Sequence, residues 1–125
     1  MNLNDLTYQI RACIFSVHNA LGPGLLESVY ESALLHELTI RNVSATSQIG
    51  LPVVYKEINM GIGFRVDILI ENQIIIEIKS IDQIHDVHKK QLLTYLKLSG
   101  LKLGLLVNFN VTKLIDKESL IRIIN

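Results

Sequence analysis

The chain has 125 residues and carries no formal net charge, with 12 Lys and Arg against 12 Asp and Glu. The neutral balance excludes a strongly basic coat for nucleic acid, and the length predicts a single domain over residues 1–125. No apolar run approaches the roughly 18 residues of a membrane span, and the N-terminus has no signal-type stretch, so we expect a soluble, cytoplasmic protein. The single cysteine, Cys13, is expected to be a buried, apolar-like thiol.

Charge is unevenly distributed along this neutral chain. Residues 1–78 carry 4 basic and 8 acidic side chains, whereas residues 79–125 carry 8 basic and 4 acidic ones. The fold can therefore present an acidic pocket beside a basic surface. The alternative, left open here, is that the opposite charges complement one another between neighbouring elements or subunits.

Two helices are predicted in the first third of the chain. Apolar residues recur at helical spacing over residues 4–21, and Asn4 is a suitable N-cap. Gly22-Pro23-Gly24 ends this helix, and a second one is predicted from about Leu25 to Arg41. Glu27 falls in its first turn, where a carboxylate is stabilised by the helix dipole; taken alone, it has this structural explanation.

The next segment is predicted to be extended. Residues 43–49 and 53–56 have strand character, with Gly50 and Pro52 marking a break or an edge, and residues 59–63 are predicted to form a turn. Residues 63–80 then contain two short runs rich in Ile and Val around the polar residues 71–73. This pattern is typical of a β-hairpin.

Three charged residues interrupt the apolar runs of this hairpin: Asp67, Glu77 and Lys79. Burying a charge is costly unless the charge is paired or binds a metal ion. Glu77 and Lys79 project from the same face of their strand because side chains alternate. Asp67 joins that face only if a three-residue loop sets the register, whereas a two-residue loop would send it to the other face.

Two carboxylates and an ammonium group would then converge on one patch of the sheet. Carboxylate pairs are common ligands of Mg²⁺, and a neighbouring lysine can orient water and stabilise charge that develops on a phosphate. The competing interpretation is a salt bridge between Glu77 and Lys79 on a solvated strand face, which is common in antiparallel sheets.

A third helix is predicted over residues 82–98, with Asp82 as N-cap and Ser99-Gly100 as the C-terminal stop. His88, Gln91 and Tyr95 lie along one stripe of this helix. His85 and His88 are also spaced for metal binding, but two histidines without further soft ligands are weak support for zinc.

The remaining sequence predicts two strands. The apolar run Leu103–Phe109 follows a helical crossover, so we expect a buried strand parallel to one hairpin strand, and residues 113–125 predict an edge strand. The order is therefore α-α-β-β-β-α-β-β, an α/β fold with a mixed sheet covered by helices on both faces. No phosphate-binding glycine loop and no serine or cysteine triad is present.

Several segments together resemble the GxxExxY family of the PD-(D/E)XK nuclease-like superfamily. Its signature matches Gly24-Leu-Leu-Glu27-Ser-Val-Tyr30. The similarity continues through Arg65-Val-Asp67, Ile76-Glu77-Ile78-Lys79, His88-Lys-Lys-Gln91-Leu-Leu-Thr-Tyr95 and Gly104-Leu-Leu-Val-Asn108-Phe109, and so covers nearly the whole chain. Val66 stands where the superfamily name has proline. The resemblance implies a restriction-endonuclease-like core.

The resemblance also implies a function and a set of site residues. The implied activity is metal-dependent hydrolysis of phosphodiester bonds in nucleic acid, and DNA is more strongly implied as the substrate than RNA. The implied metal ion is Mg²⁺ or Mn²⁺, held by Asp67 and Glu77 with help from Glu27, while Lys79 positions water. Gln91 would orient the site or contact a phosphate. The implied contacts to nucleic acid are Tyr95 and His88.

A second hypothesis keeps the nuclease fold without turnover. The chain would then be a catalytically silent interaction module in DNA processing. The complete set of charged residues speaks against this alternative, whereas the small size and neutral charge favour help from a homodimer or a partner protein.

Overall fold

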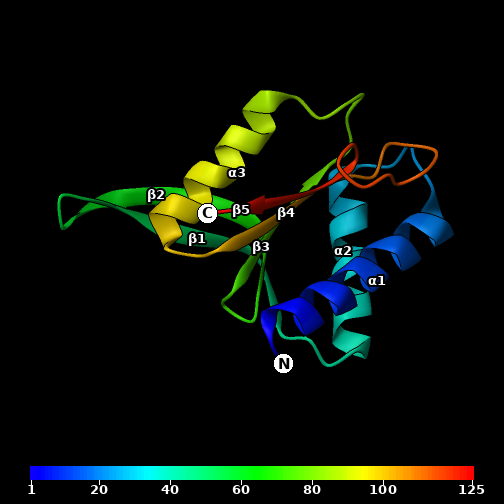
Figure 1. Cartoon of the computed structure of the whole chain (residues 1–125), viewed down its shortest axis with the longest axis horizontal. Helices are drawn as coiled ribbons and strands as arrows, with labels where there is room; N and C mark the ends of the chain where they lie inside the picture. The colour runs from blue at the N-terminus through cyan, green and yellow to red at the C-terminus, as the bar shows by residue number, and fades with distance from the viewer.

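Figure 1 shows the computed structural model, which describes residues 1–125. The elements follow the predicted order α-α-β-β-β-α-β-β. Their bounds are α1 (Leu3–Leu21), α2 (Glu27–Ile40), β1 (Ala45–Tyr55), β2 (Ile58–Ile70), β3 (Ile74–Lys79), α3 (Asp86–Ser99), β4 (Leu103–Asn108) and β5 (Leu120–Ile124). No helix is both long and apolar enough to cross a membrane.

The strands form one mixed sheet of five strands in the order β1-β2-β3-β4-β5. β3 and β4 are parallel, and the other neighbours are antiparallel. In the β2–β3 hairpin Ile70 pairs with Ile74, which confirms the predicted three-residue loop. Glu71 and Asn72 in that loop both have a φ of 54°, a left-handed conformation that closes tight turns.

Helices cover both faces of the sheet, as the sequence predicts (Figure 1). The larger core joins α1 and α2 to one face of β3 through Ile74, Ile76 and Ile78. Ile75 faces the opposite way and packs with residues of α3 in the smaller core. Because side chains alternate along β3, Glu77 and Lys79 belong to the face that α3 covers.

The helix starts differ from the predicted ones. α1 is capped by Asn2 rather than Asn4, and α2 begins at Glu27 rather than about Leu25. α3 begins at Asp86, not at residue 82, and is capped by His85. The later start of α3 has a physical reason in β4. The side chain of Asn108 exchanges hydrogen bonds with the backbone of Ile81 and keeps the segment before α3 out of a helix.

The segment before the hairpin forms a longer strand than predicted. β1 is one strand with an irregularity between Pro52 and Val54, and the turn lies at Lys56-Glu57, so the predicted turn at residues 59–63 is wrong. The β1–β2 ribbon therefore projects beyond the rest of the sheet (Figure 1). Gly63 is required in this ribbon because a Cβ there would lie 2.0 Å from the carbonyl oxygen of Leu51.

Three smaller predictions are confirmed. Cys13 is fully buried in the larger core, and this burial raises the pKa of its thiol, so it behaves as an apolar side chain. β4 is buried along its whole length and runs parallel to β3, and β5 forms the edge of the sheet beside it.

Candidate active site

Asp67 lies where the β2–β3 ladder ends. The last backbone pair is Ile68 with Ile76, and beyond it Asp67 Oδ2 accepts a hydrogen bond of 2.7 Å from the N–H of Ile78. Val66 packs in the core beneath α3, whereas Ile68 packs in the core beneath α1 and α2, so the regular alternation of β2 is broken at Asp67. The carboxylate of Asp67 thus lies between the two strands instead of on either face.

Glu77 is the neighbouring carboxyl group on β3, and it is buried. Only 7% of the residue is exposed, and its Oε1 has no hydrogen-bond partner. Burial raises the pKa of Glu77 to about 8, and the negative charge of Asp67 adds to this effect, whereas Lys79 opposes it. A buried oxygen without a partner beside a second carboxylate is an environment that a cation would stabilise.

Lys79 is half-buried on the same face of β3 and makes no ion pair. The ion pairs of the molecule are Arg11 with Asp116 and Lys89 with Asp86. The alternative of a structural Glu77–Lys79 salt bridge is therefore wrong, and Glu77 does not belong to a solvated strand face. The Lys79 ammonium group remains available for another partner.

Glu27 connects α2 to the end of β3. Its Oε2 accepts a hydrogen bond of 3.1 Å from the N–H of Ser80, the residue after Lys79. The hydroxyl group of Ser80 donates in turn to the carbonyl oxygen of Leu25 at 2.6 Å. The first turn of α2 is thus fixed against the strand that carries Glu77 and Lys79.

Tyr30 explains the third position of the Gly-Glu-Tyr signature. Its hydroxyl group donates to the carbonyl oxygen of Gly22 at 2.6 Å and accepts from the N–H of Leu25 at 3.2 Å. Its fully buried ring stacks on Phe109 with a centroid distance of 4.5 Å. Tyr30 therefore holds the loop before α2 in place, and Glu27 is the first residue of the helix that follows this loop.

Two further polar residues face Asp67, and sequence reasoning did not assign them to the site. Gln48 of β1 donates to Glu31 Oε1 at 2.7 Å and lies 3.4 Å from Asp67 Oδ1. Burial raises the pKa of Glu31, and the charge of Asp67 raises it further, while the hydrogen bond from Gln48 acts in the opposite direction. A pocket of about 450 Å³, the acidic pocket, is lined by Glu27, Ser28, Glu31, Gln48, Asp67 and Ile78.

The signals for these two residues differ. Glu31 follows Glu27 by one helical turn, and this spacing indicates that both carboxylates share one face of α2. Gln48 gives no such signal, because it has a φ of 49° opposite the break in β2, and neither feature can be read from the sequence.

α3 brings two of its three predicted residues toward the carboxylates. The ring of Tyr95 stacks on Phe64 at 4.5 Å; burial raises its pKa, and the charges of Glu77 and Asp67 raise it further. Burial and then the positive charge of Lys79 lower the pKa of His88, whereas the negative charge of Glu27 acts in the opposite direction. Gln91 is exposed and makes no hydrogen bond to the site.

The histidine pair does not form a metal site. His88 Nδ1 accepts a hydrogen bond of 2.9 Å from the N–H of His85, which closes the capping box of α3. No group of three or more His, Cys, Asp and Glu side chains is arranged to hold a metal ion. The pair therefore has a structural role at the helix start.

Asp67 is the common member of two groups of acidic side chains. On one side it neighbours the buried Glu77, and on the other it shares the acidic pocket with Glu27 and Glu31. Glu77 does not line that pocket, so the three predicted ligands do not face a single hollow. The donors fit a hard divalent cation by their chemistry, because all are carboxylate oxygens and Glu77 Oε1 lacks a partner.

A comparison with protein families identifies the superfamily of the chain. A family model described as the PD-(D/E)XK nuclease superfamily matches residues 4–123, which is nearly the whole chain. No curated protein and no solved structure matches the chain.

Proposed function

Because the chain belongs to the PD-(D/E)XK nuclease superfamily, we propose that it is a metal-dependent nuclease that hydrolyses phosphodiester bonds in DNA rather than RNA. The proposal includes membership of the GxxExxY family, action as a single domain and a cytoplasmic location. The observation that carries it is the buried Glu77 carboxyl group, which has an unpartnered oxygen beside Asp67 and an unpaired Lys79 on the same face.

We assign the metal to Asp67 and Glu77, with Glu27 acting from the first turn of α2. When bound, Mg²⁺ or Mn²⁺ would polarise a phosphoryl oxygen and lower the pKa of bound water. The ion would also remove the cost of ionising Glu77, because a positive charge beside a buried carboxyl group favours its charged form. The interaction of Glu27 with Ser80 would keep that side chain at the end of β3.

The other residues of the site act on the substrate. Lys79 orients the attacking water and stabilises the negative charge that grows on the phosphate in the transition state. Gln91, exposed on α3, contacts a phosphate, and Tyr95 and His88 face the nucleic acid beside it. Preorganised donors of this kind stabilise a transition state most where water is excluded. The burial of Glu77 indicates that this part of the site excludes water.

The experiment is a cleavage assay with single-stranded and duplex DNA and with RNA, in Mg²⁺ or Mn²⁺ and in EDTA. We expect metal-dependent cleavage by the wild-type protein, and a loss of at least about a hundredfold in Lys79→Ala and in Asp67→Asn. Glu57→Gln is the matched acidic control, because Glu57 is exposed in the turn of the β1–β2 ribbon.

Two outcomes would contradict the proposal. Cleavage that survives in both site variants would come from elsewhere, and intact nucleic acid under every condition would favour the silent interaction module. A partner protein or a homodimer would then have to supply the missing activity. Circular dichroism of each variant shows whether the fold is retained.

A further inference from the structure

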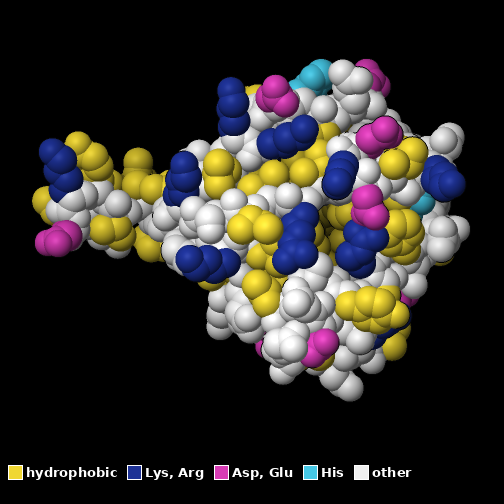
Figure 2. Space-filling view, viewed as in Figure 1, with side chains coloured by type: hydrophobic (Ala, Val, Ile, Leu, Met, Phe, Trp, Pro, Cys, Tyr) yellow, Lys and Arg dark blue, Asp and Glu magenta, His cyan; other side chains and the backbone are white.

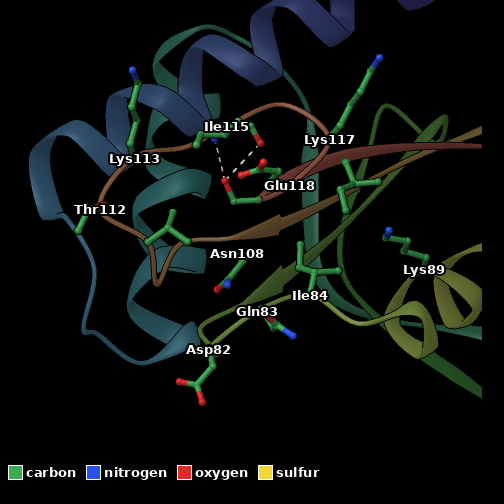
Figure 3. Close-up of a pocket in the computed structure, with 13 residues that line it drawn as sticks. Asp82, Gln83, Ile84, Lys89, Asn108, Thr112, Lys113, Ile115, Lys117 and Glu118 are labelled. Carbon is green, nitrogen blue, oxygen red and sulfur yellow. Dashed lines mark hydrogen bonds between the residues drawn. The ribbon is translucent and has the colours of Figure 1, made fainter.

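A cleft lined in part by lysines opens near the candidate active site. It has a volume of about 620 Å³ and lies between the start of α3, the end of β4 and the loop of residues 111–119. We call it the lysine cleft, and the residues used below are Asp82, Lys89, Asn108, Lys113, Lys117 and Glu118. Figure 3 shows Lys113 and Lys117 on the loop, with side chains that extend from the rim of the cleft away from Asn108, and Lys89 on α3 at another edge of the hollow.

Hydrogen bonds connect the floor of the lysine cleft to the segments on either side of it. Asn108 is 1% exposed, accepts from the N–H of Ile81 at 3.1 Å and donates to its carbonyl oxygen at 2.9 Å. The loop is fixed from the other side, because the carbonyl oxygen of Ser119 accepts from the N–H of Asn108 at 2.8 Å. Ser119 Oγ also accepts from the N–H of Ile115 at 2.8 Å. Because the backbone that carries the lysines is already held in place, binding does not have to order it.

One edge of the cleft lies near the end of β3, where the active site is proposed. Asn108 pairs with Lys79 in the register of the parallel strands, and Asp82 follows Lys79 by only three residues. Three residues span about 11 Å at most. Successive phosphates of one DNA strand advance by about 3.4 Å along the helix axis, so the edge of the cleft at Asp82 lies within roughly three nucleotide steps of Lys79.

The charges of the cleft favour a polyanion. Lys113 and Lys117 make no ion pair, and Lys89 has only a contact of 3.9 Å with Asp86. Asp82 and Glu118 also border the cleft, so its cations exceed its anions by one. Figure 2 shows Lys and Arg side chains spread over the same face, across α3, β5 and the loop before β5. Because the whole chain is neutral, attraction for DNA has to come from such a local surface.

We propose that the lysine cleft binds the sugar-phosphate backbone of the DNA strand adjoining the cleaved bond, with Lys113 and Lys117 contacting phosphates. This inference rests on the proposed nuclease function and assigns the path of its substrate. Lysine contacts to phosphate position a protein on nucleic acid without reading its sequence. The cleft therefore supplies affinity and orientation, whereas the chemistry stays at Asp67, Glu77 and Lys79.

The test measures DNA binding in EDTA, so that no cleavage intervenes. Fluorescence anisotropy gives Kd for a labelled DNA duplex at several salt concentrations for the wild type and for Lys113→Ala/Lys117→Ala. Losing two phosphate contacts should weaken binding and reduce the slope of log Kd against log salt by about 1.8. The matched control, Lys97→Ala/Lys102→Ala, removes the same charge from exposed lysines outside the cleft and should keep the wild-type slope.

The outcomes separate this inference from the proposed function. If both double variants bind with the wild-type slope, or if both lose it equally, the lysine cleft is not the binding path, whatever the cleavage assay shows. If the wild type does not bind DNA, or binds only RNA, the inference also fails. If wild-type binding depends on the cleft lysines but DNA is never cleaved, the nuclease chemistry fails while the binding path stands. Lys113→Arg/Lys117→Arg should restore the slope, since it keeps both charges.

Discussion

At the scale of single residues, the buried carboxyl group of Glu77 is the most informative feature. The sequence predicts an interrupted apolar strand, and the alternation of side chains correctly places Glu77 and Lys79 on one face. What the sequence could not give is the absence of a partner for Glu77 Oε1, because that depends on the break in β2 at Asp67. The contact between Gln48 and Asp67 lies at the same break, so the sequence does not predict it either.

Glu77 makes the stability of the metal-free protein depend on pH. Its pKa is about 8 in the folded protein and 4.5 in its ordinary state, so between these values the unfolded chain releases a proton that the folded chain retains. The free energy of unfolding should therefore fall as pH rises from about 4.5 to 8, by an amount on the order of a few kcal/mol.

Glu77→Gln should remove this contribution, because the amide stays neutral. Urea unfolding in EDTA at pH 5 and pH 8 measures the free energy of unfolding of both proteins. We expect the variant to be more stable than the wild type at pH 8. Its stability should also depend less on pH. Glu57→Gln, in the exposed turn, should behave as the wild type. Equal pH dependence in wild type and Glu77→Gln would show that Glu77 ionises normally.

At the scale of elements, the order of helices and strands follows from periodicity, and the hairpin register follows from its three-residue loop. Element boundaries fail where a distant residue intervenes. The start of α3 is displaced because Asn108 of β4 holds Ile81, and no local pattern around Asp82 reveals this contact. The β1–β2 turn is displaced because Lys56 and Glu57 adopt left-handed conformations, which their residue types rarely favour.

The attachment of α2 to the sheet is testable through the hydroxyl group of Tyr30. Tyr30→Phe removes the bonds to Gly22 and Leu25 but keeps the stacking on Phe109, and it should cost about 1–3 kcal/mol in unfolding free energy. Tyr8→Phe is the matched control, because Tyr8 is 71% exposed, and it should change stability by less than about 0.5 kcal/mol. Denaturant unfolding of both variants decides this, and equal stability would mean that the hydroxyl group does not hold the loop.

At the scale of the whole molecule, the fold separates charge while the total stays neutral. The acidic side chains of α2, β2 and β3 gather around Asp67, and Lys and Arg side chains are spread over the face seen in Figure 2. The uneven charge of the two chain halves predicts this separation, but only the fold shows that both surfaces adjoin the end of β3. Such an arrangement would place a metal-dependent centre beside the track that carries its polyanionic substrate.

The central claim is that Asp67 and Glu77 share one divalent cation. Calorimetric titration with Mn²⁺ tests it most directly, on the wild type, Asp67→Asn and the control Glu57→Gln. We predict one site in the wild type and in the control, and no binding in Asp67→Asn at the same protein concentration. Wild-type protein that binds no Mn²⁺, or Asp67→Asn that binds it as tightly as the wild type, would contradict the account.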